Sequence, residues 1–373
     1  MAHDFTRHRS STNWGVIGDG AGGYRVGRVS VSRPGPGEVA VALKASGVCH
    51  TDWDGLSTVE GPQVMGHEGA GIITEVGEGV SEFVPGQAVL LTWAIACHRC
   101  FQCQRGNEVL CEALGRSPKG AAQAPTFDEN GNTLGRYFNL GTMATSTVVR
   151  AEALVQIPEG IPFTSACLLG CAVMTGFGSV VNAAHVAPAS TVAVIGCGGV
   201  GLNVIQGARI SGARRIVAID VDSSRADMAR RLGATDFIQA QPDDTGLLRA
   251  AAEVADILGG READYAFECT AIPELGAAPL SFVHDGGTAV QVSGIEQRIT
   301  VDMKLFEWDK VYINPLYGKA RPRVDFPILF DLYLSGTLLL DELVTSTYAL
   351  ADVGQAFADM HSHKNAKGVI VLE

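Results

Sequence analysis

The fold is decided by TVAVIGCGGVG, residues 191–201. Its first five residues, TVAVI, are mostly apolar and β-branched, as in a buried strand, and LNVIQGARI after Gly201 predicts a helix. The glycine pattern between them fits a turn beneath a pyrophosphate. Gly196 would make the tight turn, Gly198 would admit the pyrophosphate, and Gly201 would let the helix pack on the strand. Gly199 and Val200 also belong to the turn, and the free N–H groups and dipole of the helix N-terminus favour phosphate.

An acidic residue follows at the spacing that this glycine pattern requires. Asp220 lies nineteen residues beyond Gly201, at the end of the apolar run RIVAI. Its carboxylate would accept hydrogen bonds from the adenosine ribose and repel a 2′-phosphate, which favours NAD over NADP. Arg225 lies about one helical turn further and would soften this discrimination.

The regions on either side of this stretch show two different patterns of predicted secondary structure. Short apolar strands alternate with helical segments through residues 176–319, a pattern that predicts a doubly wound parallel sheet and an α/β fold class. Residues 25–95 instead alternate β-rich runs with Gly/Pro turns, as in a small β-rich domain. The final GVIVLE is a further strand, which can return to the first domain.

The composition excludes several classes of protein. The 28 Lys and Arg against 40 Asp and Glu give a net charge of −12 over 373 residues, so we expect no binding to nucleic acid or to an anionic membrane. A hydrophobic content of 46% excludes a disordered chain. The N-terminus has no secretory h-region and no apolar run reaches transmembrane length, so we expect a cytoplasmic protein with reduced thiols.

Four of the nine cysteines form a dense group: Cys97, Cys100, Cys103 and Cys111. Four thiolates can close a tetrahedral zinc site with no open position, which makes a structural site. An iron–sulfur cluster is possible from the cysteine count alone, but the surrounding segment favours zinc.

A second set of metal ligands is dispersed along the chain: Cys49, His67 with Glu68 beside it, and Cys171. Such residues converge only through the fold, so their spacing alone does not establish a site. Two cysteines and one histidine would leave a fourth zinc position for water or substrate, as a catalytic site requires.

The order of these motifs carries a family resemblance. They are GVCHTD from Gly47, GHEGAG from Gly66, the four-cysteine group, LLGC ending at Cys171, and the glycine turn. Together they resemble the zinc-dependent medium-chain alcohol dehydrogenases over nearly the whole chain. The resemblance implies a GroES-like catalytic domain over residues 1–175 and 320–373 and a Rossmann NAD-binding domain over 176–319. Within the family, the chain looks most similar to thiol-dependent formaldehyde dehydrogenases and to actinobacterial primary- or aryl-alcohol dehydrogenases.

The resemblance implies two zinc ions per chain and a mechanism. Cys49, His67 and Cys171 would hold a catalytic zinc, and a zinc-bound alkoxide would give a hydride to NAD in a reversible reaction. Glu68 would be a neighbouring or exchanging ligand. Thr51 would pass the alcohol proton toward the nicotinamide ribose.

Other implied positions depart from the family pattern or concern the substrate. Many relatives end the proton relay in a histidine where this chain has Asp54. His50 and Lys367 match positions that contact the cofactor's phosphates, with Lys367 standing where many relatives place Arg. The implied pocket residues are Trp53, Trp93, Asn139 and Leu140. Its two tryptophans suggest a flat apolar wall for a primary aromatic or allylic alcohol.

Other interpretations stay open at this point. The first is a mycothiol- or glutathione-dependent formaldehyde dehydrogenase, although Cys49 and His67 are only 18 residues apart and Glu60 is the one acidic residue between Asp54 and His67. The others are a non-catalytic NAD-binding relative and an enzyme that keeps its nicotinamide tightly bound. The expected partner is a small alcohol or aldehyde, and the expected assembly is a homodimer or homotetramer.

Overall fold

The computed structural model describes residues 13–113 and 124–373, and the chain divides into two compact units. Unit 1 comprises the described residues up to Cys171, together with Pro322–Leu334 and Leu340–Glu373. Unit 2 comprises Ala172–Arg321 and Ser335–Leu339. The first twelve residues, on which the expectation of no secretory signal rests, lie outside the described part.

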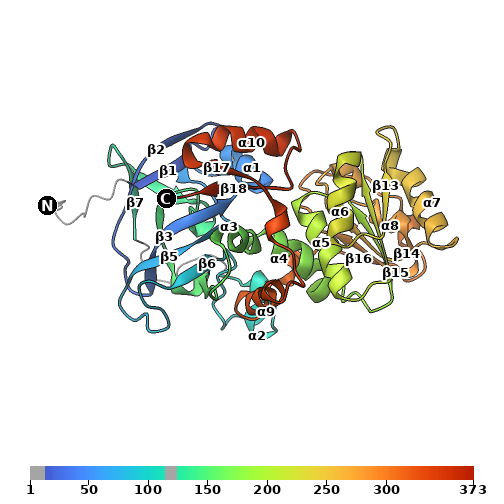
Figure 1. The fold of residues 1–373 in the computed structure, drawn as a ribbon, viewed down its shortest axis with the longest axis horizontal. Coiled ribbons are helices and arrows are strands. Elements are labelled where there is room, and N and C mark those ends of the chain that lie inside the picture. The colour runs from blue at the N-terminus through green and yellow to red at the C-terminus, as the bar shows by residue number, and fades with distance from the viewer. Residues whose placement is uncertain (1–12, 114–123) are drawn as a thin grey trace. The chain divides into compact units, whose positions relative to one another are not determined.

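Unit 2 is built on a six-stranded sheet within the described residues, in the order β13-β12-β11-β14-β15-β16 (Figure 1). The pairings between its neighbours are parallel. Strand order reverses between β11 and β14, which is the switch point of a doubly wound sheet. The strands are β11 Thr191–Ile195, β12 Arg215–Asp220, β13 Asp236–Gln239, β14 Ala263–Glu268, β15 Val283–Gln291 and β16 Val311–Ile313.

Helices cover this sheet because its strands are apolar on both sides. All five residues of β11 are buried, as expected for a central parallel strand. In unit 2, α5 packs with α6, and α7 packs with α8. The helices are α4 Ala172–Gly178, α5 Gly199–Ile210, α6 Ala226–Leu232, α7 Leu248–Ile257 and α8 Pro279–Phe282.

The turn from β11 to α5 needs its glycines for steric reasons. Gly196 has a φ of 90°, which side chains rarely adopt. A Cβ on Gly201 would lie 1.8 Å from the carbonyl oxygen of Gly196. The close packing predicted for helix and strand is therefore present.

Unit 1 is β-rich and contains a closed barrel and a second sheet in its described residues. The barrel order is β1-β2-β7-β8-β4, and the sheet order is β10-β6-β5-β3-β18-β17, with β9 also pairing with β3. The barrel strands are β1 Asn13–Gly18, β2 Tyr24–Val31, β4 Gln63–Val64, β7 Thr126–Asp128 and β8 Thr133–Arg136. The sheet strands are β3 Glu38–Gly47, β5 Gly69–Val76, β6 Ala88–Leu91, β9 Ser146–Arg150, β10 Leu154–Gln156, β17 Val344–Ala349 and β18 Lys367–Val371.

The final strand does return to the first unit. In β18, Val369–Val371 pairs antiparallel with Ala45–Gly47 of β3, although some 320 residues separate them in sequence. The core of unit 1 joins residues from both parts of the chain, among them Val41 and Phe357. The helices of the unit are α1 His50–Thr58, α2 Phe101–Gln104, α3 Phe163–Ala166, α9 Pro322–Leu334 and α10 Val353–His361.

The unit boundaries differ slightly from the ranges expected from the sequence. The breaks fall after Cys171 and Arg321 rather than after residues 175 and 319, and Ser335–Leu339 belongs to unit 2. Hydrogen bonds explain this short excursion. The side-chain amide of Gln206 in α5 bonds both backbone groups of Leu339 at 2.8 and 2.9 Å, and Arg209 donates to the carbonyl of Thr337 at 2.6 Å.

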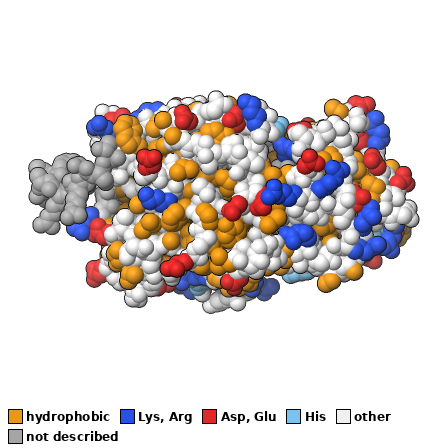
Figure 2. All heavy atoms as spheres, in the orientation of Figure 1, with side chains coloured by type: hydrophobic (Ala, Val, Ile, Leu, Met, Phe, Trp, Pro, Cys, Tyr) orange, Lys and Arg blue, Asp and Glu red, His pale blue; other side chains and the backbone are white. Residues whose placement is uncertain are grey.

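The charge distribution on the surface and the lengths of the helices are relevant to binding of nucleic acid or membranes. On the face that Figure 2 shows, acidic and basic side chains are interspersed. Within the described residues, no single helix is long and apolar enough to cross a membrane, although the bent pair Phe163–Gly170 and Ala172–Ala183 meets the length and composition criteria together.

The substitution Gly201→Ala should lower the free energy of unfolding by about 1–3 kcal/mol, because the new methyl group overlaps a backbone carbonyl and the turn must shift. Chemical denaturation measures the loss. Gly294→Ala is the matched control, since a Cβ there meets no atom within 4 Å. Equal losses in the two variants would contradict the close contact.

Candidate active site

The dispersed metal-ligand set converges in unit 1. One ligand atom from each of Cys49, His67, Glu68 and Cys171 lies within 4.8 Å of the others. Cys49 precedes α1, the His67–Glu68 pair lies between β4 and β5, and Cys171 follows the short 3-10 turn Cys167–Gly170. The fold therefore assembles the set that spacing alone left open.

Asp52 holds two members of this cluster in place, and the sequence analysis gave it no role. It is fully buried. Its Oδ1 lies 2.7 Å from His67 Nδ1, and its Oδ2 accepts a hydrogen bond from the backbone N–H of Cys49 at 3.2 Å. Because Cys49 caps α1 and Asp52 is the third helical residue, the spacing is that of a capping box. This spacing is the signal that could have identified Asp52.

The bond from Asp52 fixes which histidine nitrogen faces the cluster. With Nδ1 bound to the carboxylate, Nε2 is left as the ligating atom. Both His67 Nε2 and Glu68 Oε2 are buried and have no hydrogen-bond partner. Buried polar atoms without a partner are costly, and a cation among them would satisfy both. The two thiols, the imidazole and the carboxylate therefore fit a zinc ion.

The two thiols of the cluster, Cys49 and Cys171, interact with each other through a hydrogen bond. A hydrogen bond from Cys171, together with the nearby His67 and Lys367, holds the pKa of Cys49 well below its usual range despite burial. The same interaction with Cys49, together with burial, raises the pKa of Cys171. One thiolate is thus favoured even without a metal, as a zinc ligand requires.

Lys367 lies against this cluster and is buried. Its Nζ donates to Glu68 Oε1 and to the carbonyl oxygen of Val48, both at 2.8 Å. Burial alone would lower the pKa of Lys367, but the negative charge of Glu68, with those of Cys49 and Cys171, raises it instead. Burial raises the pKa of Glu68 to about 7 in spite of this ion pair. The structure thus gives Lys367 a role that the sequence did not suggest, and its contact with cofactor phosphates stays a prediction.

Aromatic rings surround His67, but they are only partly those expected. The Phe138 ring lies 5.2 Å from the His67 ring and 5.3 Å from the Trp93 ring, measured between centroids. Tyr137 is a further neighbour of His67, at 6.1 Å. Trp93 is thus near the cluster as expected, while Phe138 and Tyr137 were missed because aromatic residues in a loop carry no periodic signal.

The other expected pocket residues have different surroundings. Trp53 packs on Phe357 and His361 of α10, at centroid distances of 5.4 and 4.7 Å. The two tryptophans therefore have different ring neighbours and do not stack as one wall. Leu140 is fully buried in the core of unit 1, and Asn139 is partly buried.

The loop that carries Phe138 is strained and well anchored. Phe138 and Asn139 have φ values of 52° and 61°, a region unfavourable for a bulky side chain. On one side, the Tyr137 hydroxyl donates to the Thr51 carbonyl at 2.8 Å. On the other, the Thr147 hydroxyl donates to the Leu140 carbonyl at 2.5 Å. These bonds hold the Phe138 ring against His67.

Three further candidate residues, His50, Thr51 and Asp54, lie on helix α1, which begins directly after Cys49. Thr51 is partly buried, two residues after Cys49, and its carbonyl accepts the bond from Tyr137. His50 and Asp54 are exposed. His50 also lies beside His361, with ring centroids 5.6 Å apart.

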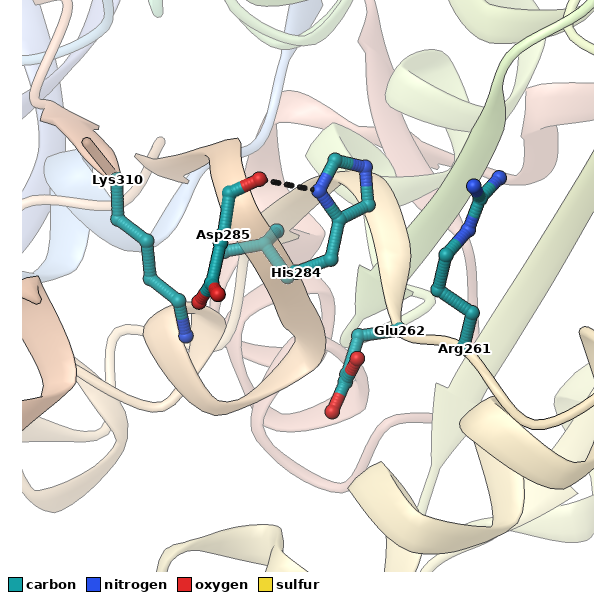
Figure 3. A pocket seen from close by; sticks show the side chains of 6 residues that line it. Arg261, Glu262, His284, Asp285 and Lys310 are labelled. Atoms are coloured by element: carbon teal, nitrogen blue, oxygen red, sulfur yellow. Dashed lines mark hydrogen bonds between the residues drawn. The ribbon is translucent and has the colours of Figure 1, made fainter. Parts of the chain in front are cut away.

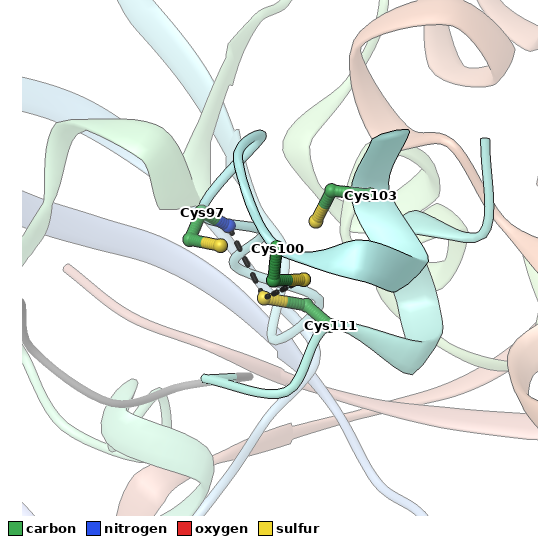
Figure 4. A group of neighbouring side chains, drawn as sticks. All are labelled: Cys97, Cys100, Cys103 and Cys111. Atoms are coloured by element: carbon green, nitrogen blue, oxygen red, sulfur yellow. Dashed lines mark hydrogen bonds between the residues drawn. The ribbon is translucent and has the colours of Figure 1, made fainter. Parts of the chain in front are cut away.

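Four further cysteines form the second group expected from the sequence. Ligand atoms of Cys97, Cys100, Cys103 and Cys111 lie within 4.8 Å of one another (Figure 4). Backbone amides point at the sulfurs: the N–H of Cys97 lies 3.3 Å from Cys111 Sγ. Backbone N–H donors also lower the pKa of Cys100 to about 6. Four converging sulfurs suit a closed structural zinc site.

The glycine turn, Asp220 and Arg225 come together in unit 2. Asp220 Oδ2 accepts the backbone N–H of Cys197 inside the turn at 2.7 Å, and Oδ1 accepts the N–H of Asp222 at 3.0 Å. Arg225 lies 3.7 Å from the same Oδ2. The Asp220 carboxylate is therefore held against the glycine turn by these hydrogen bonds. His50 and Lys367 belong to unit 1.

A surface cavity of about 360 Å³ lies elsewhere in unit 2 (Figure 3). Arg261, Glu262, His284, Asp285 and Lys310 line it, at the amino ends of β14, β15 and β16. The glycine turn follows the carboxyl end of β11, at the opposite edge of the sheet. Because cofactors bind at the carboxyl edge, this cavity is not the candidate active site.

The comparisons with known proteins agree with these two units. Residues 35–159 match the alcohol dehydrogenase GroES-like domain, and residues 199–322 match the zinc-binding dehydrogenase domain. The S-(hydroxymethyl)glutathione dehydrogenase of Paracoccus denitrificans is 33% identical over 359 residues, covering 92% of this chain and 95% of its own length. The class-3 alcohol dehydrogenase of Cereibacter sphaeroides is 31% identical over 92% of this chain and 95% of its own. The benzyl alcohol dehydrogenase structure from Acinetobacter calcoaceticus matches with a TM-score of 0.86 and 28% identity, over 98% of this chain and all of that chain.

A GroES-like unit carrying a thiol and imidazole cluster, with a Rossmann unit carrying a glycine turn, defines a two-domain zinc-binding dehydrogenase. The chain belongs to the zinc-dependent medium-chain alcohol dehydrogenase family and is an oxidoreductase.

Replacing Cys103 by Ala should remove one zinc per chain and lower the thermal midpoint, because three sulfurs leave the ion's tetrahedral shell open. Metal content by plasma emission, measured beside differential scanning calorimetry, tests both. Cys167→Ala is the control, since Cys167 is a fully buried core thiol outside both clusters. An unchanged metal content in the Cys103 variant would refute the structural site.

Asp52→Asn should weaken zinc binding at the other cluster by about 10- to 100-fold, because the amide no longer holds His67 Nδ1 as a charged acceptor. Competition with a chromogenic chelator measures the affinity. Asp54→Asn, on the same helix but exposed, should leave it unchanged. Equal affinities for all three proteins would show that Asp52 does not position the ligand.

Proposed function

We propose that the protein oxidises a primary aromatic or allylic alcohol to its aldehyde with NAD, and catalyses the reverse reduction. One observation carries this proposal above the others. The buried His67 Nε2 has no partner, is oriented by Asp52, and lies among two thiols and directly beside the Phe138 ring. This arrangement supports a metal and a planar apolar substrate at one place.

Cys49, His67 and Cys171 would hold the catalytic zinc, with Glu68 as a neighbouring or exchanging ligand. When bound there, zinc supplies the positive charge that lowers the pKa of an alcohol hydroxyl. The ion pair with Lys367 occupies Glu68 Oε1 and leaves Oε2 directed at the cluster. Lys367 would thus control how readily Glu68 approaches the ion.

The hydroxyl proton needs a path to water. Thr51 lies at the start of α1 beside the cluster, and its hydroxyl would take the first transfer. Asp54, three residues on and exposed, would accept the proton and release it to solvent in place of the histidine found in many relatives. Tyr137 fixes the Thr51 backbone and so the position of this hydroxyl.

Unit 2 would bind NAD, which accepts the hydride from the alcohol carbon. Gly196, Gly198, Gly199, Val200 and Gly201 would cradle the pyrophosphate, and Asp220 would accept the adenosine ribose hydroxyls. Arg225, beside Asp220, would neutralise part of its charge. His50 and Lys367 would add positive charge for the phosphates.

Three further assignments belong to the same proposal. Unit 1 would be the catalytic domain and unit 2 the NAD-binding domain. Cys97, Cys100, Cys103 and Cys111 would hold the second, structural zinc. The chain would act as a homodimer or homotetramer, which light scattering after gel filtration can measure.

A second candidate is a glutathione- or mycothiol-dependent formaldehyde dehydrogenase. The relatives named S-(hydroxymethyl)glutathione dehydrogenase favour it. The short spacing of 18 residues from Cys49 to His67, with Glu60 as the one acidic residue between Asp54 and His67, favours the simple aromatic alcohol.

Benzyl alcohol should have a higher kcat/KM than ethanol, and Phe138→Leu should lower this ratio by about threefold to tenfold because the aromatic contact is lost. NADH formation at 340 nm measures both substrates. Trp14→Leu is the control, since Trp14 is exposed in β1 and packs with Arg28. An ethanol preference in the unaltered enzyme contradicts the aromatic substrate, and a preference for S-hydroxymethylglutathione or its mycothiol counterpart supports the second candidate.

A further inference from the structure

The carboxylate of Glu268 is a buried hydrogen-bond acceptor at the carboxyl end of β14, and none of the roles above includes it. It is fully buried. Its Oε1 accepts the backbone N–H and the hydroxyl of Thr270, both at 2.5 Å, and the N–H of Ala271 at 3.0 Å. Its Oε2 accepts the hydroxyl of Ser293, which follows β15. One carboxylate therefore joins the segments that leave two neighbouring strands.

These segments adjoin the glycine turn. A Cβ on Gly196 would lie 2.8 Å from Thr270 Cγ2, and one on Gly201 would lie 3.4 Å from Cys269 Cβ. The backbone N–H of Cys269 donates to the carbonyl of Ile195 at 2.8 Å. Glu268 therefore sits in the same layer as the proposed pyrophosphate site.

The strand order places Glu268 on the nicotinamide half of that site. Asp220 ends β12 and marks the adenosine half, on one side of β11. A dinucleotide in a doubly wound sheet crosses the switch point, so its second half lies over the strands on the other side of β11. Those strands are β14 and β15, whose carboxyl ends carry Glu268 and Ser293.

The donors around this carboxylate are two amides and two hydroxyls, all neutral. Such donors stabilise the anion without cancelling its charge. Burial raises the pKa of Tyr312 in strand β16, and the negative charge of Glu268 raises it further. In its ionised form, the Glu268 carboxylate is therefore a buried negative charge that these neutral hydrogen-bond donors do not cancel.

We propose that Glu268 determines the relative affinity of the enzyme for the two redox states of its cofactor, favouring NAD⁺ over NADH. The inference rests on the proposed binding of NAD to unit 2. The nicotinamide ring carries a positive charge in NAD⁺ and none in NADH, so the carboxylate attracts the oxidised form alone. Ser293 acts through Glu268 as a positioning residue, because it ties the segment after β15 to that carboxylate.

Calorimetric titration of the zinc-loaded protein with NAD⁺ and with NADH, in the absence of alcohol, tests this directly. In Glu268→Gln, which keeps the shape and removes the charge, the ratio of Kd for NAD⁺ to Kd for NADH should rise by about threefold to tenfold. Glu262→Gln is the matched control. It removes one charge just before the amino end of the same strand, where Glu262 is exposed, and should leave the ratio unchanged.

Two further variants separate charge from structure. Ser293→Ala keeps the carboxylate, so it should weaken both nucleotides and leave the ratio within about twofold of the unaltered protein. Ser293→Lys places an ammonium beside the carboxylate and should raise the ratio, which provides a test if Glu268→Gln does not fold. Two results must be kept apart. If neither nucleotide binds the unaltered protein, the proposed function fails. If both bind, and the ratio is unchanged in Glu268→Gln or, should that variant not fold, in Ser293→Lys, this inference is overturned and the proposed function stands.

Discussion

The bridge made by the Asp52 carboxylate is the contact on which the ligand cluster of unit 1 depends. One oxygen holds the backbone that presents Cys49, and the other fixes the ring that presents His67. Burying a charge is costly, and the cost is offset only when each oxygen finds a donor. Asp52 meets that condition by starting a helix and orienting a metal ligand with the same side chain. The same carboxylate therefore helps to position helix α1, with Thr51 on it, and two residues of the ligand cluster.

The two units solve a similar physical problem with different chemistry. In unit 1, positive φ values at Phe138 and Asn139 are tolerated because hydrogen bonds from Tyr137 and Thr147 fix the loop on both sides. In unit 2, the carbonyl oxygen of Gly196 comes so close to Gly201 that any side chain at that position would overlap it. Contacts within the protein hold both segments in place, and such preorganisation lowers the entropic cost of binding.

Patterns within short windows of the sequence predicted the features that are determined by neighbouring residues. The glycine turn, the spacing to Asp220 and the strands of the doubly wound sheet follow from periodicity and backbone sterics, and the four-cysteine group follows from spacing. The features that the sequence did not predict depend on contacts between segments that are far apart in the chain. Phe138 reaches His67 only through loop geometry, Lys367 meets Glu68 across 299 residues, and Trp53 packs on α10 rather than beside Trp93. No pattern within a short window encodes such pairs.

The pairing of β18 with β3 has a consequence for how the chain matures during synthesis. Most of unit 2 is continuous in sequence and can fold as it leaves the ribosome. Unit 1 cannot close its sheet until residues 367–371 have been made, and those residues carry the lysine that pairs with Glu68. Lys367 therefore reaches Glu68 only after most of unit 2 has been synthesised. A nascent chain stalled before β18 would expose the edge of β3 and leave Glu68 without its ion pair.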